Sequence, residues 1–341
     1  MTAHRLLDTA YVRDGVPGLA FDGDLLRLTV FPEAGAKILD LVHKPSGFDL
    51  LWKNPRVPLR RTYPGAAFDD VWCGGWDELF PTDSPCEIDG NTFHDHGDLW
   101  HGPWEWSVEA DDGEEATLYL RRHTVALPCL MEKRLTFRRG ALHVEFQHRL
   151  TNLGAQPVPF AWNLHVAHPI SPDSRIYLPA ERLAAVPEQA GRFAAAPDAI
   201  GWPLHDGVDM GAVAGPESGL TEWLYARGLR EGWVAVAHPS AGVGLGLAFD
   251  RGLFETVWLW GVYGGWRGHY VLLTEPCTSP PGGLARNVAD GTAAWLGPGA
   301  TLETAVVATV LDRVEASLGA GERPAGLRLV ETGADVAEEA A

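Results

Sequence analysis

The feature that most constrains this chain is a two-residue alternation of apolar with polar or small residues, which recurs along most of its length. It is clearest in the segments 25–31, 116–127, 232–238 and 242–250. Successive side chains of a β-strand point to opposite faces, so this alternation is typical of strands that bury one face. Clusters of Gly, Pro, Asn and Asp separate the segments roughly every ten residues. The sequence therefore predicts an all-β protein, built as a large antiparallel β-sandwich with few short helices.

Two segments refine this expectation. KRLTFRRGALHVEFQHRLTN (133–152) alternates on both sides of Arg139-Gly140, which predicts a β-hairpin turning there. The alanine-rich segment 180–196 is interrupted by Pro187 and Gly191, so we expect a loop with at most short turns.

The domain organisation is expected to be simple. The chain has 341 residues and shows no internal repeat and no convincing linker. We expect one domain over 1–318. The last stretch, 319–341, shifts to small and acidic residues and is expected to be a flexible tail.

The charge of the chain restricts the classes of binding partner, and its cysteines indicate a cellular compartment. Lys and Arg number 27 against 45 Asp and Glu, a net charge of −18, which argues against nucleic acid and anionic membranes as partners and weakly against a multiply charged phosphorylated substrate. No signal-peptide core and no long apolar run occurs. The four cysteines, which show no CxxC, read as reduced thiols, and they are Cys73, Cys86, Cys129 and Cys277. We expect a cytoplasmic protein that is a monomer or homodimer.

The stretch HDHGDLWHGPWEW (94–106) carries three histidines and three tryptophans. Imidazoles at this density suit a metal site, tryptophans suit stacking on sugar rings, and both suit a crowded core. Its own composition leaves these three interpretations open.

Two further residues are candidates for proton transfer. Glu275 ends the apolar segment YVLLTEP, where partial burial would raise its pKa and favour a general base. His165 lies in the aromatic segment WNLHVAHPI. A solvent-facing acid and a hydrogen-bonded core histidine are the alternative interpretations of these two positions.

Several motifs of the chain together resemble those of an aldose 1-epimerase of the galactose mutarotase superfamily. They occur in the family's order between residues 31 and 311. They are FPEAGAKILDLVHKPSGFDLLW (31–52), CGGWDELFP with HGDLWHGPW (96–104), LTNLGAQPVPFAWNLH (150–165), LLTEPCTSPPGGL (272–284) and WLGPGATLETAVVATVL (295–311). The EP turn and the LGPGATLETAV segment are the most specific of these.

The resemblance implies an open sugar-binding groove on a β-sandwich of unusual size, and residue roles within it. Glu275 resembles the family's catalytic base, His165 its catalytic acid, and His96 the histidine near the sugar ring oxygen. The reaction that the resemblance implies needs no cofactor, and we expect no metal. A small-molecule sugar is the partner it implies.

The sequence departs from the family at two sugar-binding positions. The arginine that many members carry upstream of the HG motif is absent, and GGWDELFP stands there, so Trp76, Asp77 or Glu78 must do another job. Trp76 and Asp77 are therefore candidate sugar ligands, and Trp100 and Trp104 offer further aromatic faces. Asp69-Asp70 and Asp77-Glu78 are the acidic pairs that could line the groove instead. Asp209 is the candidate for the family's sugar-binding aspartate.

The predicted reaction is the interconversion of α and β anomers of a hexose or related sugar. A base takes the proton of the O1 hydroxyl while an acid protonates the ring oxygen, and the open aldehyde recloses on its other face. Glu275 as carboxylate and His165 as imidazolium, stabilised by an anionic groove, fit these roles.

Two other function classes remain open on sequence alone. A metal-dependent sugar isomerase would use the cluster His94, His96 and His101. A non-catalytic carbohydrate-binding protein would keep the groove and its tryptophans without turnover.

Overall fold

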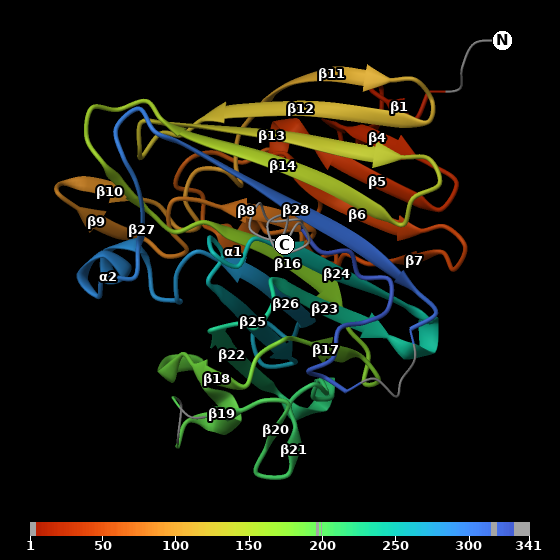
Figure 1. The fold of residues 1–341 in the computed structure, drawn as a ribbon, viewed down its shortest axis with the longest axis vertical. Helices are drawn as coiled ribbons and strands as arrows, with labels where there is room; N and C mark the ends of the chain where they lie inside the picture. Colours follow the sequence, from red (N-terminus) through yellow and green to blue (C-terminus); the bar gives the residue numbers. More distant parts are fainter. Residues whose placement is uncertain (1–4, 196–197, 199, 315–318, 331–341) are drawn as a thin grey trace, which may run out of the picture.

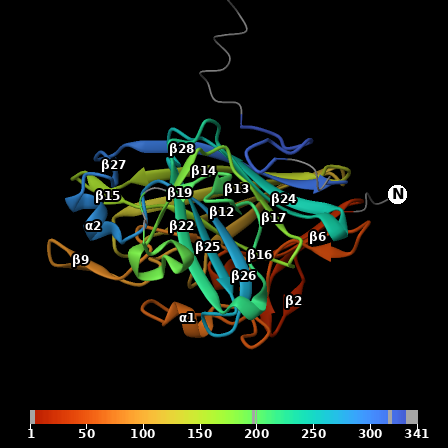
Figure 2. The same cartoon turned by 90° about the horizontal axis from the view of Figure 1, so that it is seen from below.

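The computed structural model describes residues 5–195, 198, 200–314 and 319–330. Two large antiparallel sheets, one of 12 and one of 8 strands, pack face to face, as Figures 1 and 2 show. The prediction of a large antiparallel β-sandwich is confirmed. Helices are short, also as predicted: α1 (Phe68–Val71) and α2 (Leu284–Ala289) have 4 and 6 residues.

The 12-stranded sheet carries the segments that the sequence marks as chemically active. Its hydrogen-bonded order is β1-β4-β5-β6-β8-β16-β26-β25-β22-β18-β19, and β7 pairs with β6 off this path. Its strands are β1 (Leu7–Asp8), β4 (Leu19–Asp22), β5 (Leu26–Phe31), β6 (Lys37–His43), β7 (Phe48–Asp49), β8 (Trp76–Leu79), β16 (Asn163–Pro169), β18 (Arg182–Ala185), β19 (Ile200–Gly201), β22 (Leu220–Arg227), β25 (Thr256–Tyr263) and β26 (Tyr270–Cys277).

The 8-stranded sheet contains the longest strands, and its order is β11-β12-β13-β14-β28-β24-β23-β17. Its strands are β11 (Glu105–Asp111), β12 (Glu115–His123), β13 (Cys129–Arg138), β14 (His143–Asn152), β17 (Arg175–Tyr177), β23 (Trp233–His238), β24 (Val243–Phe249) and β28 (Thr301–Asp312). The four segments with the clearest alternation in the sequence all form strands. Of these, only 25–31 belongs to the other sheet, as β5.

Short pairs and 3-10 turns complete the chain. The pairs are β2 (Val12–Arg13) with β3 (Val16–Pro17), β9 (Cys86–Ile88) with β10 (Asn91–Phe93), β15 (Val158–Phe160) with β27 (Ala294–Leu296), and β20 (Leu204–His205) with β21 (Val208–Asp209). The 3-10 turns are η1 (Pro32–Ala34), η2 (Pro187–Gln189), η3 (Gly191–Phe193), η4 (Pro216–Ser218) and η5 (Pro239–Ala241).

The predicted hairpin forms. Strand β13 ends at Arg138, β14 begins at His143, and the two pair antiparallel over their length, which confirms the turn at Arg139-Gly140. Buried and half-buried residues alternate along β13, as a strand with one face in a core requires.

The main core lies between the two sheets, and one contiguous cluster of buried side chains runs from Leu6 to Ala320. Trp76 of β8 packs on Phe146 of β14, with ring centroids 4.9 Å apart, and so joins the two sheets. Burial of one such aromatic side chain stabilises the fold by roughly 1.5–3 kcal/mol. The face of the 12-stranded sheet that points away from this core carries α1 (Figure 2).

Two predicted segments differ from expectation in detail. Segment 180–196, predicted as a loop, contains the strand β18 as well as η2 and η3, because Leu183 and Ala185 are buried against β22. In the predicted tail, residues 319–330 pack on the 8-stranded sheet: Ala320 and Leu327 are buried, and Leu327 lies in a cluster with Trp233. The boundary predicted at 319 is therefore too early, and 331–341 lies outside the described residues.

Within the described part of the chain, none of the helices has the length and apolar character to cross a membrane.

Candidate active site

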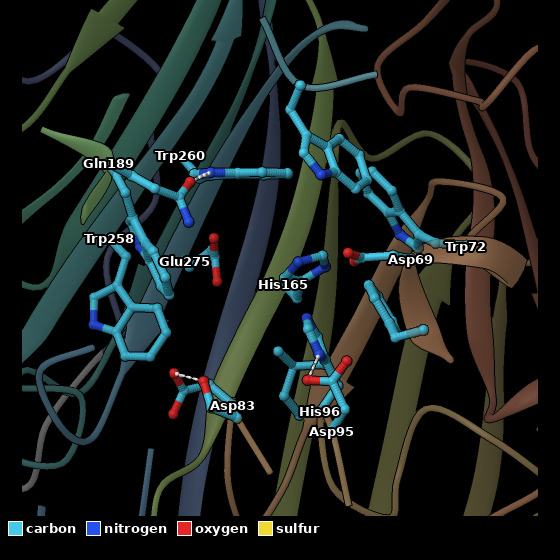
Figure 3. A pocket seen from close by; sticks show the side chains of 15 residues that line it. Asp69, Trp72, Asp83, Asp95, His96, His165, Gln189, Trp258, Trp260 and Glu275 are labelled. Atoms are coloured by element: carbon cyan, nitrogen blue, oxygen red, sulfur yellow. Dashed lines mark hydrogen bonds and ion pairs between the residues drawn. The ribbon is translucent and has the colours of Figure 1, made fainter. Parts of the chain in front are cut away.

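A pocket of about 250 Å³ lies over the outer face of the 12-stranded sheet, at β16, β26 and β25. Figure 3 shows Glu275 and His165 pointing into it from neighbouring strands, with Trp258 and Trp260 beyond Glu275 and with Asp69 and Trp72 beyond His165. Its lining consists of Phe68, Asp69, Trp72, Leu79, Asp83, Ser84, Asp95, His96, His165, Gln189, Trp223, Trp258, Trp260, Trp266 and Glu275.

Glu275 is a buried carboxyl group with one hydrogen-bond donor. It is 3% exposed, and Asn163 Nδ2 donates to its Oε2 at 2.7 Å. Burial raises the pKa of Glu275 to about 8, because the charged form loses its hydration and the single bond from Asn163 offsets only part of that loss. At neutral pH the free pocket therefore holds Glu275 mainly as the protonated acid.

His165 lies opposite Glu275 on the pocket face of β16. The register of β16 and β26 pairs Val166 with Thr274 and Asn163 with Cys277, which brings positions 165 and 275 directly across from each other. Burial, aided by His96 and Lys37 nearby, lowers the pKa of His165 well below its ordinary value of 6.5. The expectation of an imidazolium at this position is therefore wrong for the free pocket, where His165 is neutral.

His96 enters the pocket from a strained turn. Its φ is +61°, a left-handed conformation that non-glycine residues rarely adopt outside functional or tightly constrained turns. The ring stacks on Phe68 with centroids 3.8 Å apart and planes 8° apart, and His96 Nδ1 is 2.9 Å from Asp95 Oδ1. These two contacts fix the ring, which lies edge-on to that of His165 at 5.7 Å.

The glycine that follows explains the HG pair of the sequence. Gly97 has φ +67°, and a Cβ there would lie 2.0 Å from the carbonyl oxygen of Phe80. Only glycine fits this close approach, which aims His96 into the pocket.

Tryptophans form the wall beyond Glu275. Trp258 lies directly across from Glu275 on β25, and Trp260 follows it on the same face. The Trp260 indole donates to Gln189 Oε1 at 2.8 Å and packs edge-on to Trp266 with centroids 5.1 Å apart. Rings held in this way offer flat apolar surfaces to the C–H faces of a sugar.

The lining is acidic. Asp69, Asp83, Asp95 and Glu275 contribute carboxyl groups, and no lysine or arginine of the described part of the chain belongs to the lining. Asp83 accepts the backbone N–H of Gly283 at 3.0 Å, so it also ties the turn after β26 to the pocket. Burial raises the pKa of Asp69, whose carboxylate has no hydrogen bond or ion pair among the described residues. A free carboxylate in a pocket is suited to accept hydroxyl groups of a ligand.

Trp76, Trp100 and Asp77, which the sequence analysis proposed as sugar ligands, lie outside the pocket lining. Trp76 belongs to the core between the sheets because alternation along β8 turns it there. Trp100 packs edge-on beneath Phe68, with centroids 4.9 Å apart, and supports the lining from behind. Asp77 is buried next to His165 and forms an ion pair with Lys37.

Asp209 and Glu78 also take other roles. Asp209 is exposed on β21, where its carboxylate pairs with Arg175 at 2.7 Å, so it is not a pocket residue. Glu78 faces the core, where Lys133 donates to it at 2.7 Å, and Trp104 lies beside that lysine, its ring centroid 5.4 Å from Lys133 Nζ. Of the two acidic pairs considered, only Asp69 reaches the lining.

The histidine cluster of the opening motif is dispersed. His94 is exposed. His101 is buried against Arg122, and this burial, aided by the charge of Arg122, lowers the pKa of His101 to about 4. Over the residues that the structure describes, no group of three or more His, Cys, Asp or Glu side chains is placed to hold a metal ion. The geometry therefore does not support the interpretation of His94, His96 and His101 as one metal site.

Several lining residues escaped the sequence analysis. Trp258 and Trp260 stand two apart in VWLWG, a spacing that puts both on one face of a strand and was an available signal. Gln189 and Asp95 carry no comparable signal, because short turns bring them to the pocket.

The fold is shared with solved structures of low sequence identity. The Slr1438 protein of Synechocystis sp. PCC 6803 is 18% identical with a TM-score of 0.64, over 89% of this chain and 99% of that one. A candidate aldose 1-epimerase of Klebsiella pneumoniae is 16% identical with a TM-score of 0.68, over 90% and 83%. A galactose mutarotase-like protein of Clostridium acetobutylicum is 10% identical with a TM-score of 0.61, over 90% and 98%. At these identities the likeness shows the fold alone, which is galactose mutarotase-like.

No curated protein matches the chain in sequence. One family does, over residues 13–310, and its description is a domain of unknown function, DUF4432. The match covers most of the 341 residues, and the chain therefore belongs to the DUF4432 family.

Proposed function

We propose that this protein is an aldose 1-epimerase, an isomerase that interconverts the α and β anomers of a sugar by acid–base ring opening. The observation that carries the proposal is the direct cross-strand opposition of Glu275 and His165 in one aromatic-walled pocket. The reaction needs two proton-transfer groups on either side of the anomeric centre and no cofactor.

The two groups share one proton through the cycle. In ring opening, Glu275 as carboxylate takes the proton of O1, and His165 as imidazolium gives its proton to the ring oxygen. The single proton of the pair then lies on Glu275, and His165 is neutral. Burial favours this same distribution in the free pocket, so the proton passes from Glu275 to His165 before ring opening begins. Ring closure on the other face of the aldehyde reverses both transfers.

The remaining lining supports a sugar without anionic groups. Among the described residues, the lining holds four carboxyl groups and no lysine or arginine, so a phosphate or carboxylate substituent would find no ammonium or guanidinium partner there. His96 lies next to His165 and is placed to bond the sugar near its ring oxygen, while Trp258 and Trp260 cover its C–H face. We propose a neutral aldose of hexose size as the substrate class.

Saturation-transfer NMR of anomer exchange tests this proposal on neutral aldoses, an aldose phosphate and a uronic acid. We expect exchange on a neutral aldose and a loss of roughly 10²–10⁴-fold in Glu275→Gln and in His165→Ala. His94→Ala is the control, because His94 is exposed and outside the pocket, and its activity should equal wild type with or without a chelator.

The outcome separates the three function classes. Sugar binding without exchange by wild type would identify a non-catalytic carbohydrate-binding protein. Loss of exchange on chelation, or in His94→Ala, would favour metal-dependent chemistry and contradict the proposal.

A further inference from the structure

A buried ion pair stands directly behind His165. Asp77 of β8 is the cross-strand partner of His165 in the register of β8 and β16. Asp77 is 1% exposed and Lys37 is 5% exposed. Lys37 Nζ bonds Asp77 Oδ2 and donates to the carbonyl of Gly74 at 3.0 Å.

Alternation along β8 assigns this pair to the pocket side of the sheet. Trp76 and Glu78 face the core between the sheets, so Asp77 and Leu79 face the other way, and Leu79 lines the pocket. A buried ion pair is costly to desolvate, and a protein in which packed apolar residues replace such a pair is often equally stable. Stability alone therefore gives little reason for a lysine and an aspartate here.

Among the described residues, three buried polar atoms around this position lack a hydrogen bond of good geometry: Asp77 Oδ1, His165 Nδ1 and Trp72 Nε1. The Trp72 ring lies 5.6 Å from that of His165. Burial raises the pKa of Asp77, and Lys37 and the indole of Trp72 oppose that rise. Buried polar groups are nearly always bonded. An acceptor and a ring nitrogen that lie on neighbouring positions without a good bond indicate a hydrogen bond that a small side-chain rotation closes, and such bonds are often loose in the free pocket of an active site.

We propose that Asp77, held by Lys37, is a positioning residue that accepts the N–H of His165 Nδ1. The bond fixes the neutral ring as the Nδ1–H tautomer and leaves Nε2 toward the pocket. Resting on the proposed function, Nε2 is then the atom that gives the proton to the ring oxygen and takes it back, while the Nδ1 proton stays in place.

The other charged or titratable groups near the ring cannot take this role. Lys37 bears no acceptor, Glu275 and Asp69 face His165 from within the pocket, and His96 is already bonded to Asp95. Asp77 is the acidic group that faces His165 from β8, the strand on its far side from Glu275.

Nitrogen-15 NMR of the imidazole rings tests the tautomer directly, and anomer exchange tests its consequence. In wild type we expect His165 with its proton on Nδ1 and Nε2 unprotonated. Asp77→Asn should place an amide donor against Nδ1 and move the proton to Nε2. We expect kcat to fall roughly 10- to 100-fold with KM nearly unchanged.

Because Asp77→Asn leaves Lys37 without its charge partner, the double variant Lys37→Met/Asp77→Leu provides a second test. It removes both charges together and should fold, and its His165 should lose the Nδ1–H preference. The matched control is Lys133→Met/Glu78→Met. It removes another buried lysine–carboxylate pair, that of Glu78, which follows Asp77 in β8 and points to the opposite face of the sheet. Its His165 tautomer should equal that of wild type.

The inference is overturned if His165 of the wild-type protein carries its proton on Nε2. It is also overturned if Asp77→Asn and Lys37→Met/Asp77→Leu both keep the His165 tautomer and the kcat of the wild-type protein. The tautomer is measured without any sugar turnover. If wild type exchanges no anomers, the proposed function fails while the role of Asp77 toward His165 is still decided by the spectra.

Discussion

Glu275 on β26 and His165 on β16 occupy directly opposed positions on two adjacent antiparallel strands, and both are almost completely buried. Their neighbours do not offset this burial: the one amide N–H that Glu275 receives opposes the rise of its pKa only in part, and His96 and Lys37 add to the lowering of the His165 pKa. The pair therefore keeps its shared proton on the carboxyl group. Most of the pocket's expected behaviour follows from this relationship.

The first prediction concerns pH. Activity requires one proton on the Glu275–His165 pair, so kcat/KM should be level from about pH 6.5 up to about pH 8 and fall roughly tenfold per unit above that. The fall comes above pH 8 because burial raises the pKa of Glu275 to about 8. A pH–rate profile of anomer exchange measures it. A decline that starts near pH 6.5 would mean that an ordinary imidazolium carries the proton.

Glu275 should also cost stability at alkaline pH. Its pKa is about 8 in the folded chain and 4.5 in the unfolded chain, so the unfolded state releases a proton that the folded state retains. The free energy of unfolding therefore decreases as pH rises from about 4.5 to about 8. Glu275→Gln, which keeps an acceptor for Asn163, should raise the free energy of unfolding by about 1 kcal/mol or more at pH 8 and by much less at pH 5. Denaturant titrations at the two pH values check this, and an equal effect at both would contradict it.

Trp260 should contribute to sugar affinity rather than to chemistry. Its ring lines the pocket and is held by Gln189, so Trp260→Ala should raise KM roughly tenfold and change kcat little. Trp295→Ala is the control, because Trp295 is 56% exposed and lies outside the lining. Steady-state kinetics of both variants measure this effect. An equal rise of KM in Trp295→Ala would contradict stacking of the sugar on Trp260.

Gly97 should be intolerant of a side chain. Gly97→Ala places a Cβ 2.0 Å from the carbonyl oxygen of Phe80, so it should destabilise the chain and displace His96. Gly47→Ala isolates the cost of the backbone conformation, since Gly47 has a similar φ of +70° and open space around its Cβ position. We expect Gly97→Ala to cost at least ~2 kcal/mol more than Gly47→Ala in thermal or denaturant unfolding. Equal costs would mean that the Phe80 contact is easily relieved.

Asp69 should bind sugar hydroxyls, and Asp209 should not. The Asp69 carboxylate lines the pocket and has no bonded partner among the described residues, so Asp69→Asn should raise KM roughly tenfold, the loss of about one charge-assisted hydrogen bond. Asp209→Asn removes an exposed ion pair with Arg175 and should leave both kinetic constants unchanged. A rise of KM in Asp209→Asn but not in Asp69→Asn would instead support Asp209 as the sugar-binding aspartate.

The sequence was most informative where local periodicity decides the outcome. Alternation along β13 and β14, and the turn between them, follow from the two-residue repeat of a strand, so the all-β fold was predictable. Glu275 and His165 were also identifiable, because each stands within a motif of a few residues. Residue 319 was placed wrongly as the start of a tail, because composition does not show that Leu327 packs beside Trp233.

Long-range pairing decided the rest. Asp77 and Glu78 are adjacent acids of similar appearance, yet the pleat of β8 turns one toward Lys37 and His165 and the other toward Lys133 in the core. Trp76, Trp100 and Asp209 looked like sugar ligands but belong to the core, the support of the lining and the surface. Protonation was decided in the same way. The pKa of a carboxyl group or an imidazole depends on its burial and on the groups around it. Both are set by the packing of strands that are far apart in the sequence.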